Sequence, residues 1–171
     1  MKAGEILEAC VYADDLDAAE RFYTSVLGME VIARVEGRHV FFRCGGRVFL
    51  VFNPDRTREG GGAIPAHGTE GAGHVCFAMR ADEVEVWRAH LQASGVAVES
   101  DYTWPGGGRS LYFRDPAGNS VEIGTPRIWE IDEAEAQALV AAMRADRGFR
   151  VDLSHLSVAG VCRDCTAASA S

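Results

Sequence analysis

Three side chains able to bind a metal ion stand at related points of a repeated pattern in this 171-residue chain. They are Glu8, His74 and Glu122. Two carboxylates and an imidazole that converge on one partly dry site can hold a divalent cation, because the two negative groups need compensating charge. Oxygen and nitrogen ligands of this kind suit Mn²⁺, Fe²⁺, Ni²⁺, Co²⁺ or Zn²⁺. The simpler interpretation is that the three residues are polar side chains lining a wet cleft.

The pattern that contains these residues is an internal repeat, which favours a fold built from two similar units. Residues 8–13 and 74–79 both alternate as strands do, and each has a cysteine two positions after its metal-binding residue. A helix pattern with an acidic start follows each strand. It ends at Gly28 in the first unit and at Gly95 in the second, as helices commonly do at a glycine.

Each unit is therefore predicted to consist of a strand, a helix and three further strands. The units span residues 5–53 and 73–125 and together form one α+β domain, residues 1–130. The segment that connects them, residues 53–72, is rich in glycine and proline and is predicted to be a loop. Its polar side chains, among them Arg58 and His67, are interpreted as solvated.

The helix of each unit must cover one face of its sheet, so alternate strand residues project from the uncovered face. Glu8, His74 and Glu122 are assigned to that face, with Phe49 at a fourth position. Two curved sheets of this kind are predicted to bring the four positions toward one cavity.

Composition and charge argue against several classes of function. The formal charge of −8 is unsuited to a nucleic-acid surface, which needs concentrated Lys and Arg. No apolar run approaches the roughly 18–20 residues that span a bilayer. The N-terminal residues lack the apolar core of a signal peptide. We therefore expect a cytoplasmic protein without a membrane partner, whose cysteines are reduced.

The repeat resembles the vicinal-oxygen-chelate superfamily, which includes glyoxalase I, extradiol dioxygenases, fosfomycin-resistance enzymes and bleomycin-resistance proteins. The resemblance covers about residues 5–126. It rests on the stretches DDLDAAERFYTSVLG from residue 14, GHVCF from residue 73 and LYFRDPAGNSVE from residue 111. These stretches are specific for the fold and much less specific for the reaction.

The resemblance implies that Glu8, His74 and Glu122 are metal ligands and that Phe49 matches a fourth ligand used by glyoxalase I. It also implies that Tyr112 contacts the substrate, as the matching tyrosine of the fosfomycin enzymes does. Two departures from the family pattern stand out: the first ligand is usually His or Gln, and phenylalanine cannot ligate. Two-unit members commonly dimerise and build cavities across the interface, so we expect a homodimer.

The leading hypothesis is an enzyme that acts on a small oxygenated molecule through one divalent metal, by lyase, isomerase or dioxygenase chemistry. The metal would chelate adjacent substrate oxygens and stabilise an oxyanion. Glu122 or Glu8 would act as general base and Tyr112 would contact the substrate.

The competing hypothesis is a metal-free protein that sequesters a small molecule, as bleomycin-resistance proteins do. Phe49, Tyr12 and Trp104 would then be apolar walls of the binding site. A third hypothesis, a structural partner for other proteins, has only the C-terminal segment in its favour.

This C-terminal segment, residues 131–171, lies outside the repeat and is predicted to contain a helix over residues 132–146 and then a strand. Its end resembles the C-terminal segment of ferric-uptake-regulator proteins, whose last Cys-x-x-Cys helps to hold a structural zinc. The matching ligands here would be Cys162, Cys165 and His155, but the chain has no second pair to complete four ligands. We expect the segment to stabilise the domain without taking part in catalysis.

Overall fold

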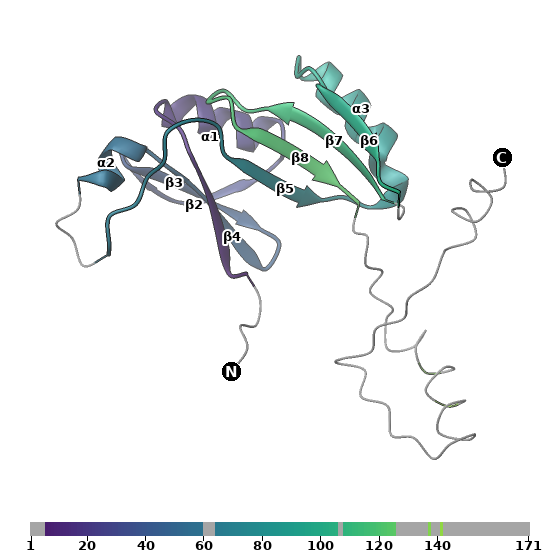
Figure 1. The fold of residues 1–171 in the computed structure, drawn as a ribbon, viewed down its shortest axis with the longest axis horizontal. Coiled ribbons are helices and arrows are strands. Elements are labelled where there is room, and N and C mark those ends of the chain that lie inside the picture. Colours follow the sequence, from purple (N-terminus) through teal and green to yellow (C-terminus); the bar gives the residue numbers. More distant parts are fainter. Residues whose placement is uncertain (1–5, 60–63, 106–107, 126–136, 138–140, 142–171) are drawn as a thin grey trace. The chain divides into compact units, whose positions relative to one another are not determined.

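The computed structural model describes residues 6–59, 64–105 and 108–125, together with residues 137 and 141 (Figure 1). Within these residues the chain forms two βαβββ units, which confirms the α+β class and the tandem repeat. No helix among them is long and apolar enough to cross a membrane. Apart from residues 137 and 141, the helix and strand expected within residues 131–171 lie outside the described residues, as do the possible zinc ligands His155, Cys162 and Cys165.

The first unit contains one four-stranded sheet and one long helix. Its elements are β1 (Glu8–Tyr12), α1 (Leu16–Ser25), β2 (Glu30–Val35), β3 (His39–Cys44) and β4 (Arg47–Phe52). The strand order is β1-β4-β3-β2, with β1 parallel to β4 and the other pairs antiparallel. Helix α1 begins where Asp15 accepts a hydrogen bond from the backbone N–H of Ala18.

The second unit repeats this arrangement. Its elements are β5 (His74–Ala78), the 3₁₀ turn η1 (Ala81–Glu83), α3 (Val84–Ala93), β6 (Ser100–Thr103), β7 (Arg109–Arg114) and β8 (Ser120–Gly124). The strand order β5-β8-β7-β6 has the same mixture of parallel and antiparallel pairs. The connecting segment is not irregular throughout, because a short helix, α2 (Pro54–Arg58), forms at its start, with Asn53 as N-cap.

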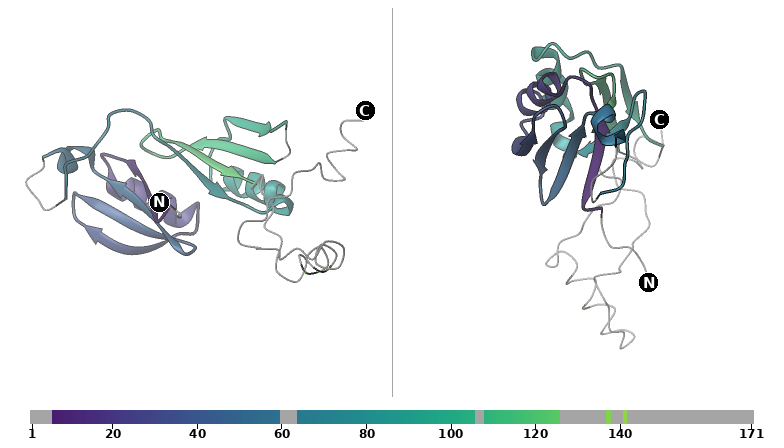
Figure 2. Two further views of the ribbon diagram at one scale, coloured as in Figure 1. Left: turned by 60° about the horizontal axis from the view of Figure 1, so that its bottom comes forward. Right: turned by 90° about the vertical axis from the view of Figure 1, so that its left-hand side faces the viewer.

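One hydrophobic core joins the helix-covered faces of both sheets. Tyr23 of α1 contacts Phe49 of β4 at a ring-centroid distance of 4.8 Å, and the neighbouring Phe22 lies 6.3 Å from Phe113 of β7. Leu91 of α3 is fully buried in the same cluster. Figure 2 shows the helices and sheets from two further sides. Within the described part of the chain, neither α1 nor α3 covers the opposite face of its sheet.

The turn between β7 and β8 connects several elements through buried polar groups. The side chain of Asp115, only 4% exposed, accepts hydrogen bonds from the Tyr23 hydroxyl and the Asn119 amide, both at 2.8 Å. Asn119 also donates to the Tyr12 carbonyl at 2.9 Å and accepts from the Gly73 N–H at 2.7 Å. Burial, followed by the Asp115 charge, raises the pKa of Tyr23, which therefore remains a donor. These contacts fix the end of β1 and the start of β5.

Candidate functional site

Two of the three predicted site residues approach each other on the uncovered face of the second sheet. In the parallel pairing of β5 with β8, His74 lies opposite Ser120 and Cys76 lies opposite Glu122. The Nε2 atom of His74 is 3.3 Å from Oε2 of Glu122. Glu122 is 8% exposed, whereas the His74 side chain is 53% exposed. The pair thus has a buried carboxylate behind an accessible imidazole.

The backbone orients the imidazole. His74 Nδ1 lies 3.1 Å from the carbonyl oxygen of Ser120. A carbonyl can only accept a hydrogen bond, so Nδ1 carries the hydrogen and the neutral ring has its lone pair on Nε2. Two acceptors, Nε2 and the Glu122 oxygen, then face each other. A metal ion bound by both atoms would stabilise this arrangement.

Glu122 also influences two neighbours on the same face. Burial, followed by the Glu122 charge and hydrogen bond, raises the pKa of the Cys76 thiol to about 12. Burial and the same carboxylate raise the pKa of the Tyr112 hydroxyl. The Tyr112 ring lies roughly parallel to the His74 ring, at a centroid distance of 6.3 Å. Tyr112 is therefore a hydrogen-bond donor beside the pair, and Cys76 is a protonated thiol rather than a nucleophile.

The third predicted residue, Glu8, lies in the other sheet. It is exposed at the start of β1, on the opposite side of that strand from the buried Val11. Among the described residues, no group of three His, Cys, Asp or Glu side chains is close enough to hold a metal ion. The single chain therefore brings His74 and Glu122 together without Glu8.

The assignment of Phe49 to the uncovered face is wrong. Phe49 is 2% exposed and packs against α1 on the helix-covered face. The strand registers pair Cys10 with Leu50 in the first unit and Cys76 with Glu122 in the second, so Leu50 is the counterpart of Glu122. A shift of one residue along a strand moves a side chain to the opposite face. Leucine cannot ligate, so the first unit still lacks a ligand at this point.

The uncovered face of the first sheet instead has a cluster of aromatic and histidine side chains. Its members are Tyr12, His39, Phe41, Phe52 and His67. Phe52 is central, with ring centroids at 4.7 Å from His67 and 5.4 Å from Phe41. The Tyr12 hydroxyl lies 2.9 Å from His67 Nδ1, so His67 has a protein partner and is not simply solvated. We call these five residues the aromatic cluster.

His39 is the unusual member of the aromatic cluster. Its ring stacks on Phe41 at a centroid distance of 4.0 Å and an interplanar angle of 13°. Its Nδ1 is buried and has no hydrogen-bond partner within the part of the chain that the structure describes. Burial, together with the nearby Arg38 charge, lowers the pKa of His39. The ring is therefore neutral, and the face remains predominantly apolar.

A cavity of about 400 Å³ adjoins the His74–Glu122 pair. It is lined by Glu99, Ser100, Tyr102, Trp104, Tyr112, Arg114 and Ser120. Tyr112 and Ser120 are the two lining residues that also contact His74. A molecule bound there would lie on aromatic surfaces next to the imidazole.

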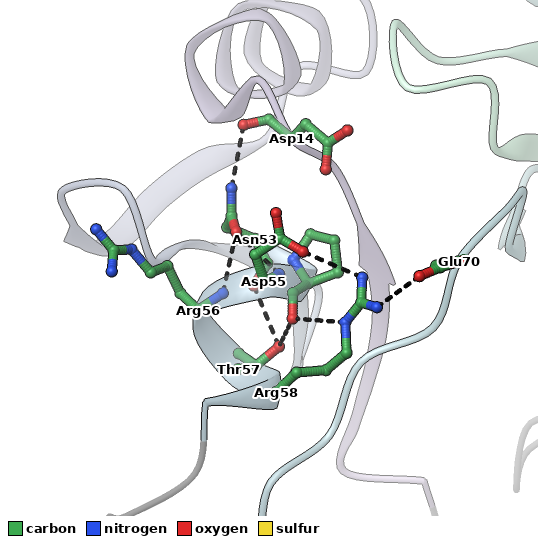
Figure 3. Close-up of polar contacts among 8 residues, drawn as sticks. Asp14, Asn53, Asp55, Arg56, Thr57, Arg58 and Glu70 are labelled. Carbon is green, nitrogen blue, oxygen red and sulfur yellow. Dashed lines mark hydrogen bonds and ion pairs between the residues drawn. The ribbon is translucent and has the colours of Figure 1, made fainter.

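A larger cavity, of about 660 Å³, lies among the end of β1, α2, residues 69–72 and the β7–β8 turn. Figure 3 shows Arg58 at this place, paired with Glu70 at 2.7 Å and Asp55 at 3.2 Å and donating to the Pro54 carbonyl. The interpretation of Arg58 as a solvated side chain is therefore incomplete. These contacts hold the connecting segment against α2, which is a structural role.

Comparisons with known proteins agree with this architecture. The profile of the Glyoxalase/Bleomycin resistance protein/Dioxygenase superfamily matches residues 5–123. Among solved structures, the chain is similar to lactoylglutathione lyase from Agrobacterium tumefaciens, with 42% sequence identity and a TM-score of 0.72. The match covers 77% of this chain and 100% of the lyase chain. A glyoxalase/bleomycin resistance protein/dioxygenase from Nocardioides is 23% identical, with a TM-score of 0.61 and coverage of 77% and 92%.

A more distant similarity is to a genomically encoded fosfomycin resistance protein from Listeria monocytogenes, 20% identical, with a TM-score of 0.55 and coverage of 74% and 95%. At such identities the last two structures show a common fold and nothing about the reaction. The profile match coincides with the stretch whose residues suggested the resemblance.

Proposed function

Because the chain belongs to the Glyoxalase/Bleomycin resistance protein/Dioxygenase superfamily, we propose that it is a metal-dependent enzyme in which His74 and Glu122 hold one divalent cation. The observation that carries the proposal is the pair of acceptor atoms facing each other at 3.3 Å, with the imidazole hydrogen engaged by the Ser120 carbonyl. Nitrogen and oxygen donors in this arrangement fit the ions named above, and an oriented imidazole is a feature of metal-binding histidines.

Glu8 would complete the site from a second copy of the chain. The His74–Glu122 pair supplies one negative charge, and Glu8 adds the second that balances a divalent ion. Glu8 shares its sheet face with the aromatic cluster, whose partly exposed rings form an apolar surface that a partner would remove from water. A homodimer in which the first sheet of one copy faces the second sheet of the other would thus satisfy both requirements and enclose the 400 Å³ cavity.

Each residue of the proposed site would have a distinct role in the reaction. A bound cation supplies Lewis-acid stabilisation of a substrate oxyanion. Glu122 is buried and hydrogen-bonded, which suits a ligand that stays in place, whereas Glu8 is exposed at a strand end and is the better candidate for moving a proton. Tyr112 would donate a hydrogen bond to substrate, and the aromatic cluster would exclude water from the reacting groups.

The first substrate to test is lactoylglutathione, the compound in the name of the 42% identical lyase. The protein would be freed of metal with a chelator and reconstituted separately with Mn²⁺, Fe²⁺, Co²⁺, Ni²⁺ and Zn²⁺. Metal stoichiometry would then be measured, together with the interconversion, in both directions, of the thioester with free glutathione and the 2-oxoaldehyde; release of the hydroxy acid would instead indicate hydrolysis. Turnover that requires one ion per site supports the proposal.

Two variants make this test specific to the site. His74→Ala should lose both metal and turnover. His90→Gln is the matched control, because His90 contacts the carbonyl of Val26 at the end of α1, away from the proposed ligands. Equal metal binding in the wild type and the His74→Ala variant would refute the assignment.

A metal-free binding protein is the alternative, favoured by one observation. Leu50 stands where the first unit would need a counterpart of Glu122, so this sheet face is apolar. Such a face, combined with the aromatic lining of the 400 Å³ cavity, suits the capture of a small apolar or aromatic molecule. Ligand binding that persists in His74→Ala, in a protein that takes up no metal, would favour this function.

A further inference from the structure

Trp104, Ser110 and Glu122 form a chain of hydrogen bonds behind the proposed metal ligands. The indole Nε1–H of Trp104 donates to Ser110 Oγ at 2.9 Å, and the Ser110 hydroxyl donates to Glu122 Oε1 at 2.5 Å. The direction of the chain is fixed, because an indole can only donate and a carboxylate can only accept. Ser110 is 2% exposed, so its hydroxyl has little access to water as an alternative partner.

The space around this chain is closely filled. A Cβ atom at Gly124 would lie 3.0 Å from Glu122 Oε1, 3.1 Å from Ser110 Oγ and 3.2 Å from Cys76 Sγ. These three groups therefore occupy the volume that the missing side chain leaves on β8. Because Gly124 lies opposite Ser110 in the antiparallel pairing of β7 with β8, the strand register itself brings the hydroxyl to the carboxylate.

We propose that Trp104 and Ser110 are positioning residues that hold Oε1 of Glu122, so that only Oε2 faces His74 and the incoming cation. The inference rests on the proposed function, in which Glu122 is a metal ligand. A carboxylate with one oxygen held by a buried donor presents a single oxygen in a fixed direction. Without the Ser110 hydroxyl, Oε1 would lose this donor, and the carboxylate would rotate toward its other neighbours, Cys76 and Tyr112.

Trp104 also connects this arrangement to the substrate cavity. It lines the 400 Å³ cavity, where its ring meets Tyr102 edge-on at a centroid distance of 4.9 Å. A molecule bound in the cavity would touch the same indole that donates to Ser110. Cavity occupancy and the orientation of Glu122 are thus coupled through one side chain.

The first experiment detects the hydrogen-bond chain in metal-free protein. The indole N–H cross-peak of Trp104 is recorded in ¹H–¹⁵N NMR spectra and assigned by its loss in Trp104→Phe. Glu122→Gln should move this peak by more than a linewidth, because the acceptor of the Ser110 hydroxyl changes. In a Ser110→Ala background the same substitution should leave it in place. A Trp104 peak that ignores Glu122→Gln, or moves equally without the Ser110 hydroxyl, would overturn the proposal.

The second experiment measures affinity for Co²⁺ at equilibrium. Ser110→Ala should weaken binding by about 10- to 100-fold, the usual cost of removing a group that orients a metal ligand. Ser110→Thr keeps the hydroxyl and should restore most of the affinity, and Ser25→Ala, at an exposed serine of α1, should have no effect. Wild-type affinity in folded Ser110→Ala would refute the positioning role. A wild type that binds no metal would contradict the proposed function, and the NMR comparison would still decide whether the chain exists.

Discussion

The orientation of Glu122 can be tested through the thiol beside it. Two causes raise the pKa of Cys76: desolvation is the larger, and the negative charge of Glu122 is the second. Glu122→Gln removes the charge and leaves the desolvation in place. The substitution should therefore lower the pKa of Cys76, which should still lie above the ordinary value for a cysteine because desolvation by the neighbouring protein remains. In this way a change at the proposed ligand becomes a measurable change in cysteine reactivity.

The size of the effect follows from the pKa of about 12. At pH 8 such a thiol is ionised in about one molecule in ten thousand, whereas an ordinary cysteine is ionised in roughly one tenth to one quarter of molecules. Glu122 accounts for part of this roughly thousandfold suppression. Because the thiolate is the reactive species, we expect alkylation of Cys76 to become about tenfold faster, or more, in the Glu122→Gln variant.

The assay follows iodoacetamide modification of each cysteine by mass spectrometry, on chelator-treated protein between pH 7 and 10. Cys44 is the internal control, because burial alone raises its pKa and Glu122 has no part in that shift. Its rate should be the same in both proteins. An unchanged or slower rate at Cys76 would refute the geometry in which the carboxylate faces the thiol.

Three further predictions concern the fold and the assembly. Tyr23→Phe should destabilise the domain by about 1.5–3 kcal/mol in urea titrations, because it deletes a buried hydrogen bond to a charged aspartate. Gly124→Ala should crowd the Glu122 carboxylate and weaken metal binding, whereas Gly46→Ala, with no atom within 4 Å of the added carbon, should not. Phe41→Arg should yield a monomer in light scattering, because it places a charge at a partly exposed position of the aromatic cluster on the proposed interface, and Val86→Arg, at an exposed site on α3, should leave the oligomeric state unchanged.

The fold could be predicted because the sequence repeats its local signals. Gly28 and Gly95 end the two helix patterns, and both have positive φ, at 65° and 73°. Two local features differ from the expectation. Asn53 followed by proline starts a helix, although the glycine and proline content of residues 53–72 predicts a loop. Residues 48–52 are all apolar, so their alternation does not indicate a face, and the alignment of the two repeats places Phe49 one position out of register.

Only part of the candidate site could be predicted from the sequence. Glu122 could be assigned to its face because it interrupts an apolar strand between two buried residues, Val121 and Ile123. The contribution of Ser110 could not, since it depends on the register of two antiparallel strands and has no motif of its own. His67 was hidden for a different reason: it lies in a glycine-rich segment, where neither period of two nor period of 3.6 indicates a partner.

Because Glu8 is separated from the His74–Glu122 pair, tight metal binding should require the proposed dimer, whereas the dimer should not require metal. One chain offers two of the three predicted ligands and a single negative charge, so its affinity for a divalent ion should be low. Dimerisation would add Glu8 and raise that affinity, and by linkage the ion would favour the dimer. The partly exposed aromatic cluster should nevertheless hold the dimer without metal. Loss of the dimer should therefore abolish tight metal binding, whereas loss of a ligand should leave a metal-free dimer.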